Sequence, residues 1–193
     1  MMLRSHKVVE CTSLVGPGKR FCLWVQGCKR HCEGCMATET WDMNGGYPIN
    51  TEDVIRNVLE TDDIEGITFL GGEPFEQAEA LSIIGKAVRK EGLSVVTFTG
   101  YTIEEIVDTR NEGFRELLAV TDLLIDGAFR IELKSLDRPW IGSSNQRHIF
   151  MTERYSLKNI KTVKNKLEVR IYPDGRTMVS GMGEFTKIYE YMI

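Results

Sequence analysis

The sequence predicts an α/β fold organised around a parallel sheet. Four apolar runs have the composition of buried strands, and amphipathic helical patterns separate them, which is the order typical of a parallel sheet. These runs are residues 21–25, 64–70, 93–99 and 122–126. The chain has 193 residues, of which 42% are hydrophobic. That is enough to bury one sizeable core, so we expect a single domain over residues 1–193.

Capping and turn residues mark where the other elements begin and end. Asn50 or Thr51 is placed to cap the first helix, and Gly92 is placed to end the second. Residues 7–12 alternate weakly and predict an edge strand before the turn at 16–18, which reads Gly-Pro-Gly. The expected helices cover residues 52–60, 76–91, 103–107 and 110–120.

The end of the chain has a different pattern. Residues 167–172 alternate strictly between apolar and polar side chains, residues 173–176 read Pro-Asp-Gly-Arg, and a second alternating run follows at 177–180. This is the pattern of a β-hairpin with a tight turn. We therefore expect a two-stranded C-terminal ribbon, and its apolar face has to cover something.

Charge and cysteine content narrow the class of protein. The net charge is −4, the pI is about 5.5, and no run of five or six like charges occurs. This is not the pattern of a nucleic-acid or membrane-surface binder, and neither a signal peptide nor an 18-residue apolar span is present. Five cysteines favour metal-ligating thiols in a reduced compartment over a disulfide framework. We expect a cytoplasmic protein.

Three of the cysteines are close together after the first apolar run. Cys28, Cys32 and Cys35 have the spacing C-x3-C-x2-C, which lets one loop wrap three thiolates around an iron–sulfur cluster. Three ligands leave one iron of a four-iron cluster open to a substrate or cofactor. Two alternatives stay open. Three structural cysteines on one helix face would have the same spacing, and a zinc site would need Cys22 or His31 as its fourth ligand.

This motif, together with Gly71-Gly72-Glu73-Pro74 at the end of the second apolar run, resembles the signatures of radical S-adenosylmethionine enzymes. Gly16-Pro17-Gly18, Gly27 and Thr40-Trp41 resemble one branch of that family in particular, the activating enzymes of glycyl-radical enzymes, and most closely the anaerobic ribonucleoside-triphosphate reductase activating proteins. The resemblance implies two cofactors. They are a [4Fe-4S] cluster held by the three cysteines and S-adenosylmethionine chelated at its open iron.

The resemblance also implies which residues hold S-adenosylmethionine. The segment 71–74 would bind its amino group. Gly34 stands where the broad family often has an aromatic residue, and Met36 would pack against the purine. Thr99 follows a strand, where it either touches the cofactor or caps a helix, and Asp126 ends a buried strand beside a glycine. The expected cofactor-binding residues are Gly34, Met36, Gly71, Gly72, Glu73, Pro74, Thr99 and Asp126.

The implied fold is an open partial (β/α) barrel, with its core at about 14–148 and a C-terminal extension at 149–193 that carries the hairpin. The implied reaction takes a hydrogen atom from a glycine of an anaerobic ribonucleotide reductase or a related enzyme, with a flavodoxin- or ferredoxin-type electron donor. The polar stretch 140–147 either lines the active site, receives a partner loop or caps itself in solvent. Two other functions stay open. They are a stand-alone radical enzyme acting on a peptide or small metabolite, and a non-catalytic zinc- or cluster-stabilised binding module.

Overall fold

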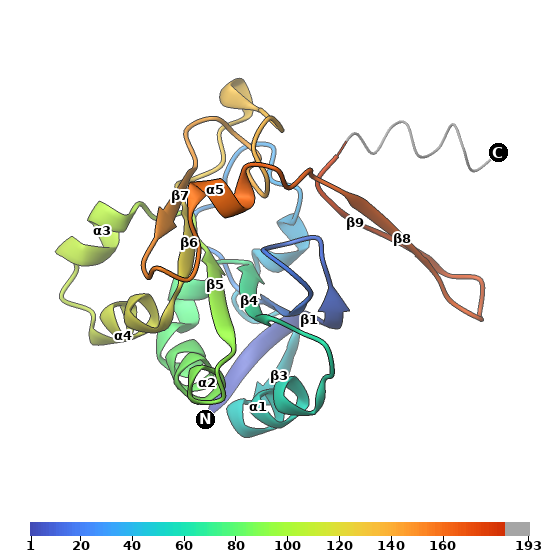
Figure 1. The fold of residues 1–193 in the computed structure, drawn as a ribbon, viewed down its shortest axis with the longest axis horizontal. Coiled ribbons are helices and arrows are strands. Elements are labelled where there is room, and N and C mark those ends of the chain that lie inside the picture. The colour runs from blue at the N-terminus through green and yellow to red at the C-terminus, as the bar shows by residue number, and fades with distance from the viewer. Residues whose placement is uncertain (184–193) are drawn as a thin grey trace.

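The computed structural model describes residues 1–183 and contains a seven-stranded sheet with the order β3-β1-β2-β4-β5-β6-β7 (Figure 1). The strands β2, β4, β5 and β6 are parallel, as the sequence predicts, whereas β1, β3 and β7 join antiparallel at the two edges. No closed barrel is present within residues 1–183. The bounds are β1 Met2–Thr12, β2 Arg20–Val25, β3 Tyr47–Asn50, β4 Gly66–Gly71, β5 Ser94–Phe98, β6 Leu123–Asp126 and β7 Arg147–Phe150.

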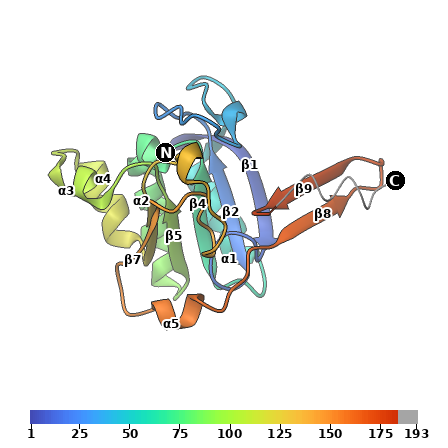
Figure 2. The same cartoon turned by 90° about the horizontal axis from the view of Figure 1, so that it is seen from above.

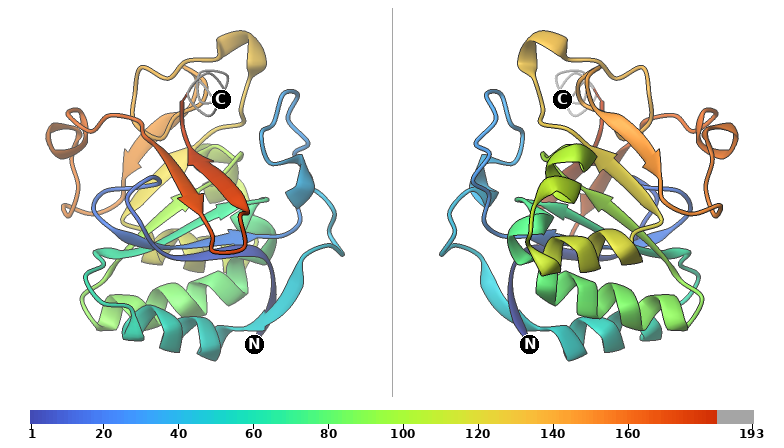
Figure 3. Two further views of the ribbon diagram at one scale, coloured as in Figure 1. Left: turned by 90° about the vertical axis from the view of Figure 1, so that its right-hand side faces the viewer. Right: turned by 90° about the vertical axis from the view of Figure 1, so that its left-hand side faces the viewer.

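The helices α1, α2 and α4 form a layer on one side of the sheet (Figure 3). The side chain of Asn50 accepts a hydrogen bond from the amide of Glu52, so Asn50 is the cap of the first helix. No helix of the described part of the chain is long and apolar enough to cross a membrane. The bounds are α1 Thr51–Glu60, α2 Ala78–Lys90, α3 Ile103–Asp108, α4 Glu112–Val120 and α5 Leu157–Ile160, with 3-10 turns η1 Thr38–Thr40, η2 Pro74–Gln77 and η3 Ile131–Leu133.

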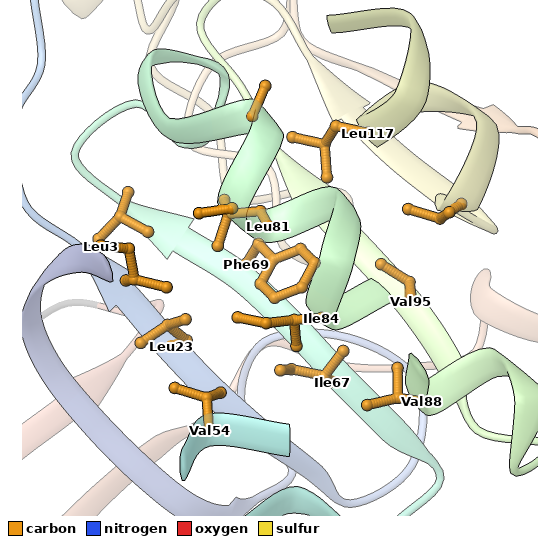
Figure 4. Packing of buried hydrophobic residues seen from close by; sticks show 14 of the residues in the cluster. Leu3, Leu23, Val54, Ile67, Phe69, Leu81, Ile84, Val88, Val95 and Leu117 are labelled. Atoms are coloured by element: carbon orange, nitrogen blue, oxygen red, sulfur yellow. The ribbon is translucent and has the colours of Figure 1, made fainter. Parts of the chain in front are cut away.

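The main core lies between the sheet and the helix layer (Figure 4). Alternate residues of the central strands point into it, and the apolar stripes of the helices meet them, which is the expected result of a period of two packed on a period of 3.6. Labelled members of this core are Leu3, Leu23, Val54, Ile67, Phe69, Leu81, Ile84, Val88, Val95 and Leu117, all buried.

Loops and the short helix α5 cover the other face of the sheet. Val96 and Ile125 point to this side, where they pack with Trp140 from the long connection between β6 and β7. The sequence predicts that the strand at 93–99 is covered on both faces, and the burial of Val95 on one side and Val96 on the other confirms it.

A buried arginine explains the Gly-Pro-Gly turn. Arg20 is fully buried and donates hydrogen bonds to Thr68 Oγ1 at 2.6 Å, to the carbonyl oxygen of Pro17 at 3.1 Å and to the hydroxyl of Tyr155 at 3.3 Å. Burial lowers the pKa of its guanidinium. Gly16 has a φ of 131°, and a Cβ there would lie 2.6 Å from Arg20 Cδ. The turn therefore has to be glycine-rich to pack against this side chain.

Two strands were not expected from the sequence. β3 is short and mostly exposed, so it has no apolar periodicity of its own. β7 begins inside the polar stretch 140–147, because Arg147 pairs across the sheet with Asp126 and the following residues pair with the rest of β6. Hydrogen bonding to a neighbouring strand determines both elements, and that neighbour is distant in sequence.

The C-terminal hairpin is confirmed. β8 Leu167–Ile171 and β9 Thr177–Gly181 form a separate two-stranded sheet that projects from the body (Figure 2). The turn closes with a hydrogen bond from the Tyr172 amide to the carbonyl oxygen of Arg176 at 2.8 Å, and Gly175 takes a φ of 82°.

Candidate functional site

A cavity of about 320 Å³ opens on the face of the sheet opposite the layer of α1, α2 and α4. Its apolar floor is formed by one residue from each parallel strand, namely Trp24, Leu70, Phe98 and Ile125. These residues lie near the carboxyl ends of the strands, where small-molecule sites of α/β folds gather. The size is within the range of ligand pockets.

The three clustered cysteines all line this cavity, and each of them is half-buried. Their loop returns to its start through a hydrogen bond from the Gly27 amide to the carbonyl oxygen of Thr40 at 2.8 Å. Left-handed backbone at His31 and Gly34 bends the chain between the ligand positions. Because the loop is not helical, the alternative of three structural cysteines on one helix face is wrong.

The zinc alternative lacks a fourth ligand in residues 1–183. Cys22 is fully buried in an apolar cluster away from the loop, and burial raises the pKa of its thiol to about 12. The ring of His31 stacks on Trp41 at 4.5 Å between centroids. Within the described residues, no three His, Cys, Asp or Glu side chains are grouped so that they could hold a single metal ion.

Gly71 and Gly72 also line the cavity, and they let β4 pack closely against the start of the cysteine loop. The Gly72 amide donates to the carbonyl oxygen of Val25 at 2.8 Å. A Cβ on Gly71 would lie 2.8 Å from the backbone of Val25, and one on Gly72 would lie 2.4 Å from the carbonyl oxygen of Gly27. Both positions therefore require glycine because the backbones approach so closely.

Glu73 is buried at the next position and ties β4 to β5. Its carboxylate accepts hydrogen bonds from the Thr99 hydroxyl at 2.8 Å, the Gly100 amide at 2.8 Å and the Phe75 amide at 3.0 Å. Burial nevertheless raises the pKa of Glu73 to about 7. Glu73 and Thr99 both line the cavity. Thr99 does not cap the following helix, because Thr102 does so.

Of the remaining expected cofactor-binding residues, two line the cavity and two are buried outside it. Gly34 and Met36 line the cavity, and Met36 is 79% exposed. Pro74 is buried at the start of η2 and does not line it. Asp126 is fully buried and does not line it either. Its carboxylate accepts a hydrogen bond from Arg147 Nε at 2.9 Å and another from the Ile103 amide at 2.8 Å.

Arg30 lies between two of the cysteines and was not singled out from the sequence. Its guanidinium donates to the carbonyl oxygen of Gly100 and, at 3.1 Å, to Glu105, and it lies 4.4 Å from the centre of the Tyr101 ring. These contacts tie the cysteine loop to the turn after β5. The signal in the sequence that could have identified Arg30 is its basic side chain inside the cysteine motif.

Trp41 provides a test of whether a bound group fits here. It lines the cavity, and its buried indole Nε1–H finds no acceptor within residues 1–183. A buried donor without a partner is costly. A group with acceptor atoms would satisfy it, and the three thiols beside it are the ligands that an iron–sulfur cluster takes. The residues present therefore fit a cluster with a bound cofactor. Trp140 and Gln146 also line the cavity, so the stretch 140–147 takes one of the three places expected for it. Phe129 and Met182 are cavity residues that sequence reasoning missed.

Comparisons with known proteins match this arrangement. The family model described as a 4Fe-4S single cluster domain matches residues 14–149. The pyruvate formate-lyase 1-activating enzyme of Escherichia coli K12 is 29% identical over 196 residues, covering 95% of this chain and 75% of that protein. The anaerobic ribonucleoside-triphosphate reductase-activating protein of the same strain is 34% identical over 149 residues, 73% of this chain and 94% of that protein. Its counterpart from Salmonella typhi is 30% identical over 152 residues, which cover 75% of this chain and 96% of that protein. The chain therefore belongs to the 4Fe-4S single cluster domain family, in the group of radical S-adenosylmethionine proteins that contains the activating enzymes of glycyl-radical enzymes.

Proposed function

We propose that this chain removes one hydrogen atom from a backbone glycine of an anaerobic ribonucleotide reductase or a related glycyl-radical enzyme. One observation carries the proposal. Three thiols with cluster-binding spacing and the segment Gly71, Gly72 and Glu73 line the same cavity, in a chain that aligns over most of its length with activating enzymes of this kind.

Once bound, the cluster and S-adenosylmethionine would supply, with one electron from a donor, the radical chemistry that removes the glycine hydrogen. The unpaired electron left on the glycine is delocalised into both flanking amides, which explains why glycine is the target.

The chain's own residues hold and orient these groups. Cys28, Cys32 and Cys35 are the proposed cluster ligands, and Trp41 offers its free N–H to the bound group. Glu73 fixes the turn after β5 through Thr99 and Gly100. The proposed cofactor contacts at the cavity wall are Gly34, Met36, Gly71, Gly72, Glu73 and Thr99.

Two of the expected cofactor residues are proposed to act through their neighbours. Pro74 starts the 3-10 turn η2, whose first amides are capped by Glu73. Asp126 holds Arg147 and the start of α3. Each of them therefore shapes the cavity wall without facing the cavity.

Several wider features belong to the same proposal. The mostly parallel sheet is a partial barrel of the radical S-adenosylmethionine type, in one domain with its core at about 14–148 and an extension at 149–193. An open barrel suits a substrate that is a loop of another protein. The electron donor is of the flavodoxin or ferredoxin type. The compartment is the cytoplasm, where thiols stay reduced.

Anaerobic reconstitution tests the proposal. The chain is loaded with iron and sulfide, reduced, and mixed with S-adenosylmethionine and either anaerobic ribonucleotide reductase or pyruvate formate-lyase. We expect 5′-deoxyadenosine by chromatography and a glycyl radical by electron paramagnetic resonance. Cys32→Ala should abolish both, whereas Cys11→Ala, a change at an exposed cysteine outside the cavity, should abolish neither. A cluster-loaded wild type that yields no glycyl radical on either enzyme would contradict the proposal.

A further inference from the structure

The C-terminal arm, defined as β8, its turn and β9, touches the body through its polar face. The Thr12 hydroxyl donates to Glu168 at 2.9 Å, and Arg170 Nη2 donates to the carbonyl oxygen of Cys11 at 2.9 Å. Lys7 Nζ reaches the hydroxyl of Ser180 at 3.5 Å. Glu168 and Ser180 are cross-strand partners, so they share one face of the ribbon. The side of the arm that faces β1 is therefore polar.

The opposite face, which we call the outward face, is mostly apolar, and it is most exposed towards the turn. It carries Leu167, Val169 and Ile171 of β8, with Val179 and Thr177 of β9 opposite Val169 and Ile171. Val169 is 43% exposed and Ile171 is 74% exposed. A ribbon that packs on its own body normally turns its apolar face inward, and a two-stranded ribbon has little stability alone. The outward face of the arm is therefore built to be covered by something other than the described body.

The base of the arm reaches the cavity. Met182 follows β9 directly and lines the cavity. Before β8, Asn165 accepts a hydrogen bond from the Trp140 amide at 2.9 Å, and Trp140 is another cavity residue. A protein that lies along the arm is thus brought to the mouth of the site. The arm also lies beyond residues 14–149, the part that matches the family model.

The charge of this region is opposite to that of the body. Residues 153–183 contain seven Lys and Arg against three Asp and Glu, a net charge of +4, whereas residues 1–152 contain 16 against 23, a net charge of −7. Four exposed lysines lead into the arm, at positions 158, 161, 164 and 166. The arm itself, residues 167–181, carries two arginines and two acidic residues, so the positive charge of this region lies in the lysines at its base.

We propose that the outward face of the arm is the docking surface for the protein that carries the target glycine, and that the docked segment is extended and apolar with acidic flanks. This inference rests on the proposed function. An extended segment pairs with the edge of a two-stranded ribbon or lies on its face, and acidic flanks meet the exposed lysines.

The test is the double variant Val169→Thr with Ile171→Thr, which keeps β-branched side chains in the strand and removes apolar surface. The matched control is Val107→Thr, at a valine of α3 that is 56% exposed. Glycyl-radical formation is titrated with the enzyme that wild type activates, anaerobic ribonucleotide reductase or pyruvate formate-lyase. We expect the KM for that enzyme to rise at least about tenfold in the double variant, as for loss of interface anchors, with kcat retained and the control unchanged.

Salt provides a second measurement that does not depend on how the variant folds. Raising the ionic strength from about 0.05 to 0.2 M should increase the wild-type KM several-fold, because screening weakens the contact between opposite charges. A KM that does not change with salt would overturn the proposal that the docked segment has acidic flanks.

The outcomes separate the two proposals. If wild type forms a glycyl radical and the double variant keeps the wild-type KM, the docking surface is wrong and the proposed function stands. If wild type forms no glycyl radical on either enzyme, both are overturned. Light scattering could also find that wild type is a dimer and that the double variant is a monomer, which would assign the outward face to a second copy of the chain. If a chain that ends at Gly183 shows faster hydrogen exchange in β8 than the full chain, the outward face would be assigned to residues 184–193. Either result overturns the docking proposal.

Discussion

The carboxyl group of Glu73 sets two physical effects against each other, and their balance can be measured. Three donors point at it, which favours the ionised form, while complete burial favours the neutral form. Burial dominates, so the pKa of Glu73 in the folded chain is raised to about 7 from its ordinary value of 4.5. Between these two pKa values the folded state keeps a proton that the unfolded state has released. The stabilisation is therefore fully present below about pH 4.5 and is lost as the pH rises through 7.

The magnitude follows from the shift. One pKa unit corresponds to about 1.4 kcal/mol, so the chain should lose roughly 2–3 kcal/mol of its free energy of unfolding between pH 5 and pH 8 through Glu73. Glu73→Gln cannot titrate and removes this dependence. It also leaves the Gly100 amide facing an NH2 group, which costs about 1–3 kcal/mol at every pH.

Urea unfolding of the reduced chain without cofactors measures the effect. The difference in free energy of unfolding between wild type and Glu73→Gln should fall by about 2–3 kcal/mol from pH 5 to pH 8. Glu79→Gln, at an exposed position of α2, is the control for the loss of one carboxylate. If the Glu73→Gln difference grows with pH, the three hydrogen bonds outweigh burial and the reasoning is refuted.

Three further predictions concern the same region. Cys32→Ala should abolish iron binding and the brown absorbance of the reconstituted chain, and should lower the melting temperature of the apo-chain little because Cys32 is only half-buried. Gly71→Ala should destabilise the chain by about 3 kcal/mol in urea unfolding, since φ is 110° and the new Cβ would lie 2.8 Å from the Val25 backbone; a loss below 1 kcal/mol would contradict this. Arg147→Gln should cost about 1–2 kcal/mol, because it leaves the buried carboxylate of Asp126 without its charged partner, while the 42% exposure of Arg147 lets solvent screen the pair. A loss no larger than that of a surface substitution would show that Asp126 finds another partner.

Local patterns were sufficient for most of the fold. The four apolar runs, the cap at Asn50 and the alternation of residues 167–172 each depend on neighbours along the chain, and each corresponds to an element of the structure. The cysteine motif and the glycine-rich segment were expected to share one site, and they line one cavity.

Features that depend on contacts between residues distant in sequence could not be predicted from local patterns. Asp126 looked like a site residue because it ends a buried strand, but its antiparallel pairing with Arg147, 21 residues later, directs its carboxylate to that side chain. The alternation in β8 predicted which side chains share a face. It did not predict that the polar face would be the one that meets β1, because the contact between Arg170 and Cys11 spans 159 positions.

The position of Arg20 has a consequence for the order in which the chain becomes complete on the ribosome. Its hydrogen bond to Tyr155 spans 135 residues, and Tyr155 also contacts Ser94 at 2.7 Å. A nascent chain that stops short of Tyr155 has a guanidinium at the amino-terminal end of its sheet that lacks one of its acceptors. Arg20 keeps its acceptors on Thr68, Pro17 and Ile67 at that stage. The contact with Tyr155 is therefore a late step that fastens the segment after β7 to the start of β2, once residue 155 has left the ribosome.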